Sequence, residues 1–138
     1  MKKFVFLCLI SIFAVSCSVG DGSGENSFYY QFLPIETADV PDTMVLNETY
    51  QINVTYYRPT TCHSFNDFYF QKNDNERTVA VINRVLDSEN CEDLANDLVE
   101  VSFNFVCLYS GSYVFKFWQG VDANNNDVYY EVEVPVVE

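Results

Sequence analysis

The sequence has 138 residues, 49% of them hydrophobic, which suffices for one domain with one core. Seven lysine and arginine residues stand against 20 aspartate and glutamate residues, so the formal net charge is −13 at pH 7. A chain this acidic offers no basic patch to phosphate groups, which excludes nucleic acid as a partner and disfavours direct docking on anionic lipid headgroups.

The N-terminus carries the pattern of an export signal. Two lysines follow Met1, and the apolar run from Phe4 to Val15 is too short to cross a bilayer as a helix, which needs about 20 residues. The sequence Ala14-Val15-Ser16-Cys17 resembles the lipobox of bacterial lipoproteins, although the box usually begins with leucine. The resemblance implies a signal peptide over residues 1–16, acylation of Cys17 (a palmitate-type anchor) and an envelope location, in the outer membrane facing the periplasm or the surface. Cleavage without lipidation is the alternative.

Residues 17–27 follow as a polar segment rich in glycine and serine, which predicts a flexible tether. Ten extended residues reach at most ~36 Å, so the domain would stand away from the membrane. Removal of residues 1–16 takes two lysines and no acidic residue, which leaves 5 basic against 20 acidic residues and a formal charge of −15.

From Phe28 onward the hydrophobic pattern has a period of two, which is typical of half-buried strands. Pro34 interrupts the first strand, as suits an edge or a strand that switches sheets. A polar loop before the fifth strand is expected to hold one helical turn over residues 91–98. Seven short strands predict an all-β antiparallel sandwich over residues 28–138. The expected strands are 28–40, 49–57, 65–71, 77–86, 98–108, 112–119 and 128–134.

The segment Leu108–Phe115 resembles the corner between strands E and F of immunoglobulin-like domains, where a glycine precedes a tyrosine. The resemblance implies that the hydroxyl of Tyr113 bonds back to the corner. Phe115 would then stand where antibody domains carry a core cysteine. The expected fold is an immunoglobulin-like β-sandwich of about seven strands, with a lipocalin-like barrel or another small sandwich as the alternative.

Three cysteines remain in an oxidising compartment once Cys8 is cleaved off and Cys17 acylated. If the strands alternate in direction as in the immunoglobulin-like fold, the loops that hold Cys62 and Cys91 share one end of the sandwich. We therefore predict a Cys62–Cys91 disulfide and a buried, reduced Cys107. A loop of about 28 residues closed in this way contributes roughly 3–4 kcal/mol in the chain-entropy model.

The chain offers little catalytic chemistry. His63 is the only histidine, which is too few for a usual zinc site, and no serine is placed against it. We expect His63 to be an exposed loop residue, and we expect neither an enzyme nor a cofactor.

The Asn-rich loop before the last strand resembles an EF-hand calcium loop, with Asp122, Asn124 and Asn126 alternating and Glu133 at the twelfth position. The sixth position is Asp127, where that loop needs glycine. A plain hairpin turn is the preferred interpretation and calcium the alternative.

Strand alternation places Tyr69, Trp118 and Tyr129 on one outward face, where flat rings can stack on sugars or anchor a protein partner. The alternative is that these rings simply cover sheet edges. The sequence thus predicts a non-catalytic envelope lipoprotein that presents its domain for binding or adhesion, with a glycan-binding accessory module as the specific version. A structural or assembly component of an envelope complex is the alternative. Asp42-Thr43-Met44 also resembles a short O-glycosylation site of exported proteins of some Gram-negative bacteria.

Overall fold

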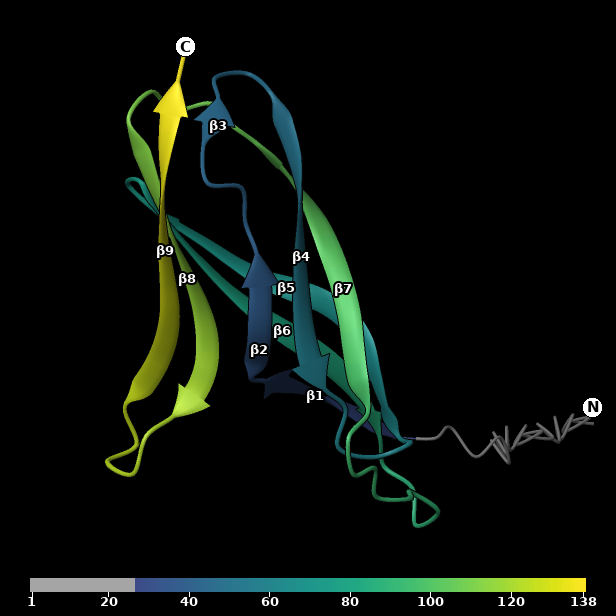
Figure 1. Cartoon of the computed structure of the whole chain (residues 1–138). Helices are drawn as coiled ribbons and strands as arrows, with labels where there is room; N and C mark the ends of the chain where they lie inside the picture. The colour runs from purple at the N-terminus through teal and green to yellow at the C-terminus, as the bar shows by residue number, and fades with distance from the viewer. Residues whose placement is uncertain (1–26) are drawn as a thin grey trace, which may run out of the picture.

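The computed structural model describes residues 27–138, and within them the chain forms nine strands and no helix (Figure 1). The all-β prediction is confirmed, whereas the helical turn expected over residues 91–98 is wrong: this segment is an irregular loop. The strands are β1 (Phe28–Leu33), β2 (Ile35–Asp39), β3 (Met44–Val45), β4 (Thr49–Tyr57), β5 (His63–Asn73), β6 (Glu76–Leu86), β7 (Leu98–Val106), β8 (Ser112–Val121) and β9 (Asp127–Val137).

The strands divide into two sheets. One has three strands in the order β2-β4-β7, all antiparallel. The other has six strands: β5 pairs with one edge of β6, while the opposite edge of β6 is shared by β1 and β8, after which come β9 and β3. Figure 1 shows the β5–β6 hairpin running obliquely across the direction of β4 and β7.

The order of the six-stranded sheet differs in one respect from that of an immunoglobulin domain, in which strands C, F and G are neighbours. Here β6 lies between β5 and β8, and it pairs with β8 in parallel over Glu76–Val79. The strands β2, β4 and β7 follow the A-B-E order of the other immunoglobulin sheet, whereas strand D of that sheet corresponds to β6, which here lies in the six-stranded sheet. The hydroxyl of Tyr113 accepts a hydrogen bond of 3.1 Å from the backbone N–H of Leu108, which is the contact predicted for the corner.

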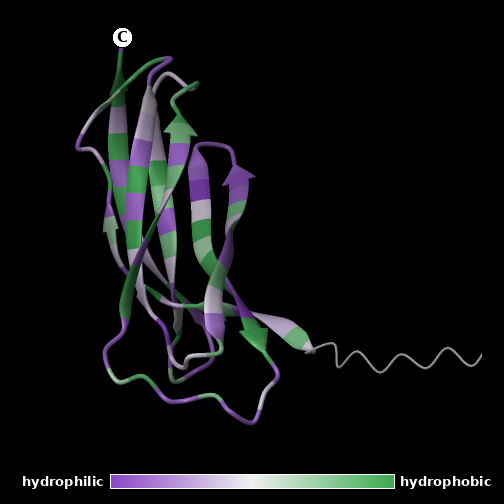
Figure 2. Ribbon diagram, turned by 90° about the vertical axis from the view of Figure 1, so that its right-hand side faces the viewer, coloured by the Kyte–Doolittle hydropathy of each residue, from purple (hydrophilic) through white to green (hydrophobic). Residues whose placement is uncertain are grey.

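The core lies between the two sheets and follows the alternation of the strands (Figure 2). On β4 the alternate residues Ile52, Val54 and Tyr56 are fully buried. The six-stranded sheet contributes a facing set of buried valines and phenylalanines from β6 and β8. Since alternate residues of a strand point to opposite faces, the same strands must present their other rows to solvent.

Pro34 marks the point where the chain leaves one sheet for the other, as the sequence indicated. β1 pairs with β6 as far as Leu33, and β2 begins at Ile35 in the three-stranded sheet. Proline has no N–H for a ladder, so the pairing ends there without an orphaned donor. Gly120 of β8 has a φ of +99°, a backbone conformation that favours glycine, and a Cβ added there would lie 3.4 Å from the Pro34 ring, in ordinary contact.

The departure of β1 opens a fork in the six-stranded sheet. The pairing of β1 ends at Val81 of β6, the pairing of β8 ends at Val79, and Ala80 lies between them. Beyond this point the register of β8 against β9 shifts between Trp118 and Val121. At the fork β1 and β8 therefore separate along one edge of β6, and neither strand pairs with β6 at Ala80.

Candidate functional site

The outer face of the six-stranded sheet carries the three aromatic residues singled out by the sequence. Tyr69 pairs with Ala80 across β5 and β6, and Trp118 pairs with Tyr129 across β8 and β9. Ala80 stands between the core residues Val79 and Val81, and Trp118 follows the core residue Phe117, so these two positions face away from the core. Tyr69 and Tyr129 share that outer face as their cross-strand partners. The structure brings them together around the fork.

A cavity of about 380 Å³ lies at this fork, and we call it the aromatic cavity. Its centre is β6, where the outward side chains are the small Thr78 and Ala80, so the surface is low between the flanking rings. The rings come from four different strands. The lining residues are Phe32, Tyr69, Gln71, Thr78, Ala80, Trp118, Asp127 and Tyr129.

Phe32 of β1 forms one wall of the aromatic cavity, and the sequence analysis did not predict it. Its ring makes edge-to-face contacts with Tyr69 and with Trp118, at centroid distances of 5.8 and 6.1 Å. The side chain nevertheless remains 49% exposed. Edge-to-face pairs hold rings at fixed angles, so the cavity has a defined shape before any ligand arrives. The alternation of β1 contained the signal for an outward Phe32, but not the pairing of β1 with β6.

Polar groups stand at the rim of the aromatic cavity. The indole Nε1 of Trp118 donates a 2.9 Å hydrogen bond to Oδ1 of Asp127, which fixes both side chains. Gln71 adds a side-chain amide and Thr78 a hydroxyl. These groups can donate and accept hydrogen bonds toward a ligand, while the rings supply flat apolar contact.

One cation is already present beside the cavity. The ammonium of Lys116 lies 4.9 Å from the centroid of the Tyr129 ring and 3.9 Å from a carboxylate oxygen of Glu131. A ring that already faces an ammonium group attracts a second cation less strongly, because the two charges repel. The Tyr129 ring therefore already has a cation of the protein against it.

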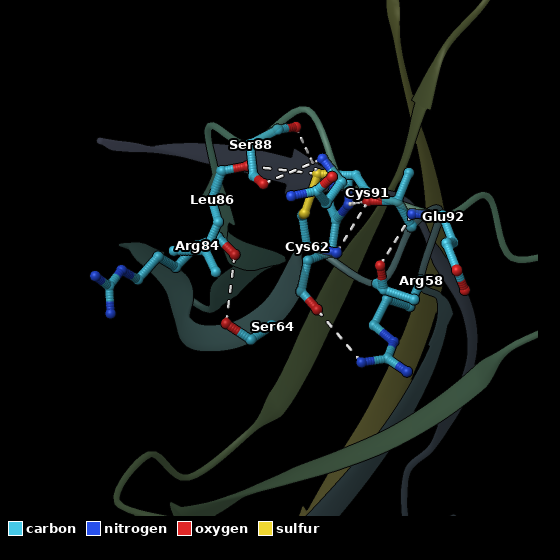
Figure 3. The surroundings of a disulfide bond; sticks show 12 residues. Arg58, Cys62, Ser64, Arg84, Leu86, Ser88, Cys91 and Glu92 are labelled. Carbon is cyan, nitrogen blue, oxygen red and sulfur yellow. Dashed lines mark hydrogen bonds between the residues drawn. A yellow bond between two sulfur atoms is a disulfide. The ribbon is translucent and has the colours of Figure 1, made fainter. Parts of the chain in front are cut away.

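The disulfide predicted between Cys62 and Cys91 is confirmed, with a Cα–Cα distance of 5.4 Å. It joins the β4–β5 connection to the β6–β7 connection, with Leu86 and Ser88 on one side and Glu92 on the other (Figure 3). The same connections are tied by backbone bonds: Thr61 N–H donates to the Glu92 carbonyl at 2.9 Å. Cys107 is free and fully buried, as predicted, and burial raises the pKa of its thiol.

His63 is not the exposed loop residue that the sequence led us to expect. It is the first residue of β5, only 7% exposed, and its ring faces the inside of the sheet. Nδ1 lies 2.8 Å from the Thr60 hydroxyl and Nε2 lies 2.9 Å from the side-chain oxygen of Gln31. Burial lowers the pKa of His63, and the nearby Arg58 guanidinium lowers it further. The prediction failed because β5 begins two residues earlier than expected and the side chain of Gln31, from β1, reaches the His63 ring.

The calcium candidates lie in the turn between β8 and β9. Oδ1 of Asp122 accepts hydrogen bonds from the backbone N–H groups of Asn124 and Asn126, and these bonds lower the pKa of the carboxyl. Glu133 lies on β9, six extended residues beyond Asp127, which is roughly 20 Å. The carboxylate of Glu133 accepts a hydrogen bond from Ser112 instead. The arrangement is that of a hairpin turn, and residues 27–138 contain no group of three His, Cys, Asp or Glu side chains suited to a metal.

The remaining predictions from the sequence concern residues that lie partly outside the described range 27–138. Residues 1–16, the acylation candidate Cys17 and residues 18–26 of the expected tether lie outside the described residues. Asp42 and Thr43 are exposed, whereas Met44, the third residue of that motif, is buried in the core. In the described part of the chain no helix is long and apolar enough to span a bilayer. Comparisons with models of protein families, with curated proteins and with solved structures give no match.

Proposed function

We propose that this chain is a non-catalytic cell-envelope lipoprotein, anchored through Cys17, whose immunoglobulin-like β-domain binds an uncharged glycan in the aromatic cavity. The observation that carries the proposal is the convergence of four rings from four strands on one hollow, with hydrogen-bonding groups at its rim. The lipobox-like sequence before Cys17 supports the anchor, and the A-B-E order of the three-stranded sheet with the Tyr113 contact supports the immunoglobulin-like assignment.

The chemistry of a sugar suits this site. One face of a pyranose ring is a patch of C–H groups that packs on an aromatic ring, while the hydroxyls at its edge need donors and acceptors. Phe32, Tyr69 and Trp118 offer ring surface, and Gln71 and Asp127 offer polar atoms within the same hollow. Small-molecule sites are mainly apolar with a few placed polar groups, and a volume near 380 Å³ lies at the small end of their range of ~300–1,000 Å³.

Charge narrows the ligand class. With a formal charge of −15 after signal removal, the protein repels polyanions such as nucleic acids and acidic polysaccharides. An uncharged glycan does not meet this penalty.

Binding is testable because Trp118 is the only tryptophan of the chain, so its fluorescence reports on the aromatic cavity. The full-length protein, purified in detergent, should retain neutral glycans on an array, and the retained glycan should change the Trp118 emission. Tyr69→Ala should weaken this binding about tenfold or more, a loss of about 1.4 kcal/mol. Tyr57→Ala is the matched control, since Tyr57 is 45% exposed on β4 in the other sheet.

The anchor is tested separately. Cells fed labelled palmitate should incorporate the label into the wild-type chain but not into a Cys17→Ser variant, which should leave the membrane fraction. Equal labelling of both forms would show that the lipid is attached elsewhere or that the label is nonspecific, and no labelling of either would favour simple secretory cleavage.

A structural component of an envelope assembly is the second candidate, and the open sheet edges favour it. Within the described residues β5 pairs only with β6, and β7 pairs only with β4, so each leaves one row of backbone groups for a partner strand. Absence of any retained glycan, together with co-purification of one envelope protein at fixed stoichiometry, would favour assembly over glycan binding.

A further inference from the structure

A second hollow of about 310 Å³ lies on the same outer face, next to the aromatic cavity. The two hollows share Phe32, which stands as the wall between them. We call the second hollow the side cavity. It is lined by Tyr30, Gln31, Phe32, Asn66, Asp67 and Ile82.

The side cavity resembles the first in the kinds of group that line it. Each hollow combines aromatic rings with one carboxylate and side-chain amides: Asp127 with Gln71 in the first, Asp67 with Gln31 and Asn66 in the second. Each carboxylate is held by one oxygen, since Oδ1 of Asp127 accepts from the indole of Trp118 and Oδ1 of Asp67 accepts from the Phe68 N–H at 2.8 Å. In both, the second oxygen has no hydrogen-bond partner among the described residues.

Backbone geometry makes the two hollows adjacent. Tyr30 and Phe32 are alternate residues of β1 and both point outward, so they are spaced by ~6.6–6.8 Å along the strand. The register of β5 shifts between Phe65 and Asp67, which turns Asn66 out of the regular pleat at the rim of the side cavity. Tyr30 is 58% exposed, and its ring surface continues the row of rings from Phe32 toward the start of β1.

We infer that the two hollows are neighbouring subsites for a single linear, uncharged oligosaccharide that passes over Phe32. This inference rests on the proposed glycan-binding function and specifies its ligand: a chain of at least two neutral sugar units, rather than a free monosaccharide or a branched terminus. A repeating ligand explains why one surface carries two hollows that share an aromatic wall and each combine rings with a carboxylate and amide groups.

The test is a length series. Oligosaccharides of the cello, malto and manno series, from one to six units, are titrated calorimetrically against the full-length protein in detergent. For the series that binds, affinity should rise at least tenfold between one unit and the length that fills both subsites, and then level off. Tyr30→Ala should reduce the affinity for the long ligand to that of the short one and leave the short ligand unaffected.

Variants separate the subsites from a folding defect. Asp67→Asn keeps the acceptor for the Phe68 N–H but replaces the charged oxygens with a neutral amide, which accepts weaker hydrogen bonds from sugar hydroxyls. It should therefore lower the affinity for the long ligand alone. Tyr57→Ala should leave the whole series unchanged, and thermal unfolding checks that each variant is folded. A flat length dependence, or long-ligand binding that survives both Tyr30→Ala and Asp67→Asn, overturns the two-subsite inference while the aromatic cavity stands. Failure of all three series to bind overturns the glycan-binding function as well.

Discussion

The same strands form the inner and the outer face of the six-stranded sheet, but the side chains of the two faces differ in burial. On the inner face Phe115 and Phe117 of β8 are fully buried, and on the outer face Phe32 and Tyr69 remain 49% and 39% exposed. Local propensity is the same for both, because aromatic residues favour strands on either side. The difference is the three-stranded sheet, which covers only one face. Aromatic residues on the covered face therefore hold the fold, and those on the other face are free to bind.

Truncation of one ring on each face tests whether the inner rings stabilise the fold more than the outer rings do. Phe115→Ala leaves a cavity among Phe105, Phe117 and Tyr113, and should cost about 3–5 kcal/mol of unfolding free energy. Tyr69→Ala removes an exposed ring and should cost less than about 1 kcal/mol. Urea unfolding of the two variants measures both. Equal losses would mean that the outer rings are a second core.

Removal of the disulfide tests whether side-chain packing alone stabilises the end of the sheet that holds Cys62 and Cys91. Cys62 and Cys91 join the start of β5 to the middle of the β6–β7 loop, and neither cysteine belongs to the core cluster. The double variant Cys62→Ser with Cys91→Ser should lose roughly 3–4 kcal/mol by the chain-entropy model. Wild-type protein unfolded under reducing conditions should match the variant. A loss below about 1 kcal/mol would show that packing alone holds this end.

Much of the inner and outer division could be predicted from the sequence. Period-two alternation assigns faces without any knowledge of partners, which is why the outward Tyr69, Trp118 and Tyr129 were found. The direction of successive strands likewise placed Cys62 and Cys91 at one end before any pairing was known.

What the sequence could not provide is the set of non-local pairings. β1 pairs with residues about fifty positions later, and β6 pairs in parallel with β8 over four residues, too short for a sequence signal. Phe32 was missed for this reason, since its place beside Trp118 depends on the fork. His63 was misplaced because Gln31, which bonds to its ring, comes from β1, another part of the chain.

A single hydroxyl on the inner face should have a smaller effect. Tyr113 is 1% exposed, and its hydroxyl accepts the hydrogen bond from the Leu108 N–H. Tyr113→Phe keeps the ring and removes the acceptor, so it should cost about 0.5–1.5 kcal/mol. Urea unfolding measures the loss, with Tyr57→Phe on the exposed side of β4 as the matched control. A loss no larger than that of the control would show that the corner is held by ring packing.

His63, a polar residue on the covered face, should make the free energy of unfolding depend on pH. Nε2 of His63 can only donate to the Gln31 oxygen, so in the neutral ring Nδ1 accepts from the Thr60 hydroxyl, and protonation of Nδ1 removes that acceptor. Burial, then Arg58, lowers its pKa below the 6.5 of an unfolded chain. The folded protein therefore binds this proton less readily than the unfolded chain does.

The sign follows from this difference in proton uptake. Stability from the neutral ring is fully present above pH 6.5 and is lost as the pH falls from there through the lowered pKa of the folded state. Urea unfolding between about pH 7.5 and 5 isolates the histidine, because carboxyls titrate mainly below that window. His63→Gln should flatten the slope. An unchanged slope in that variant would assign the pH dependence to another group and leave the polar end of the inner face insensitive to this proton.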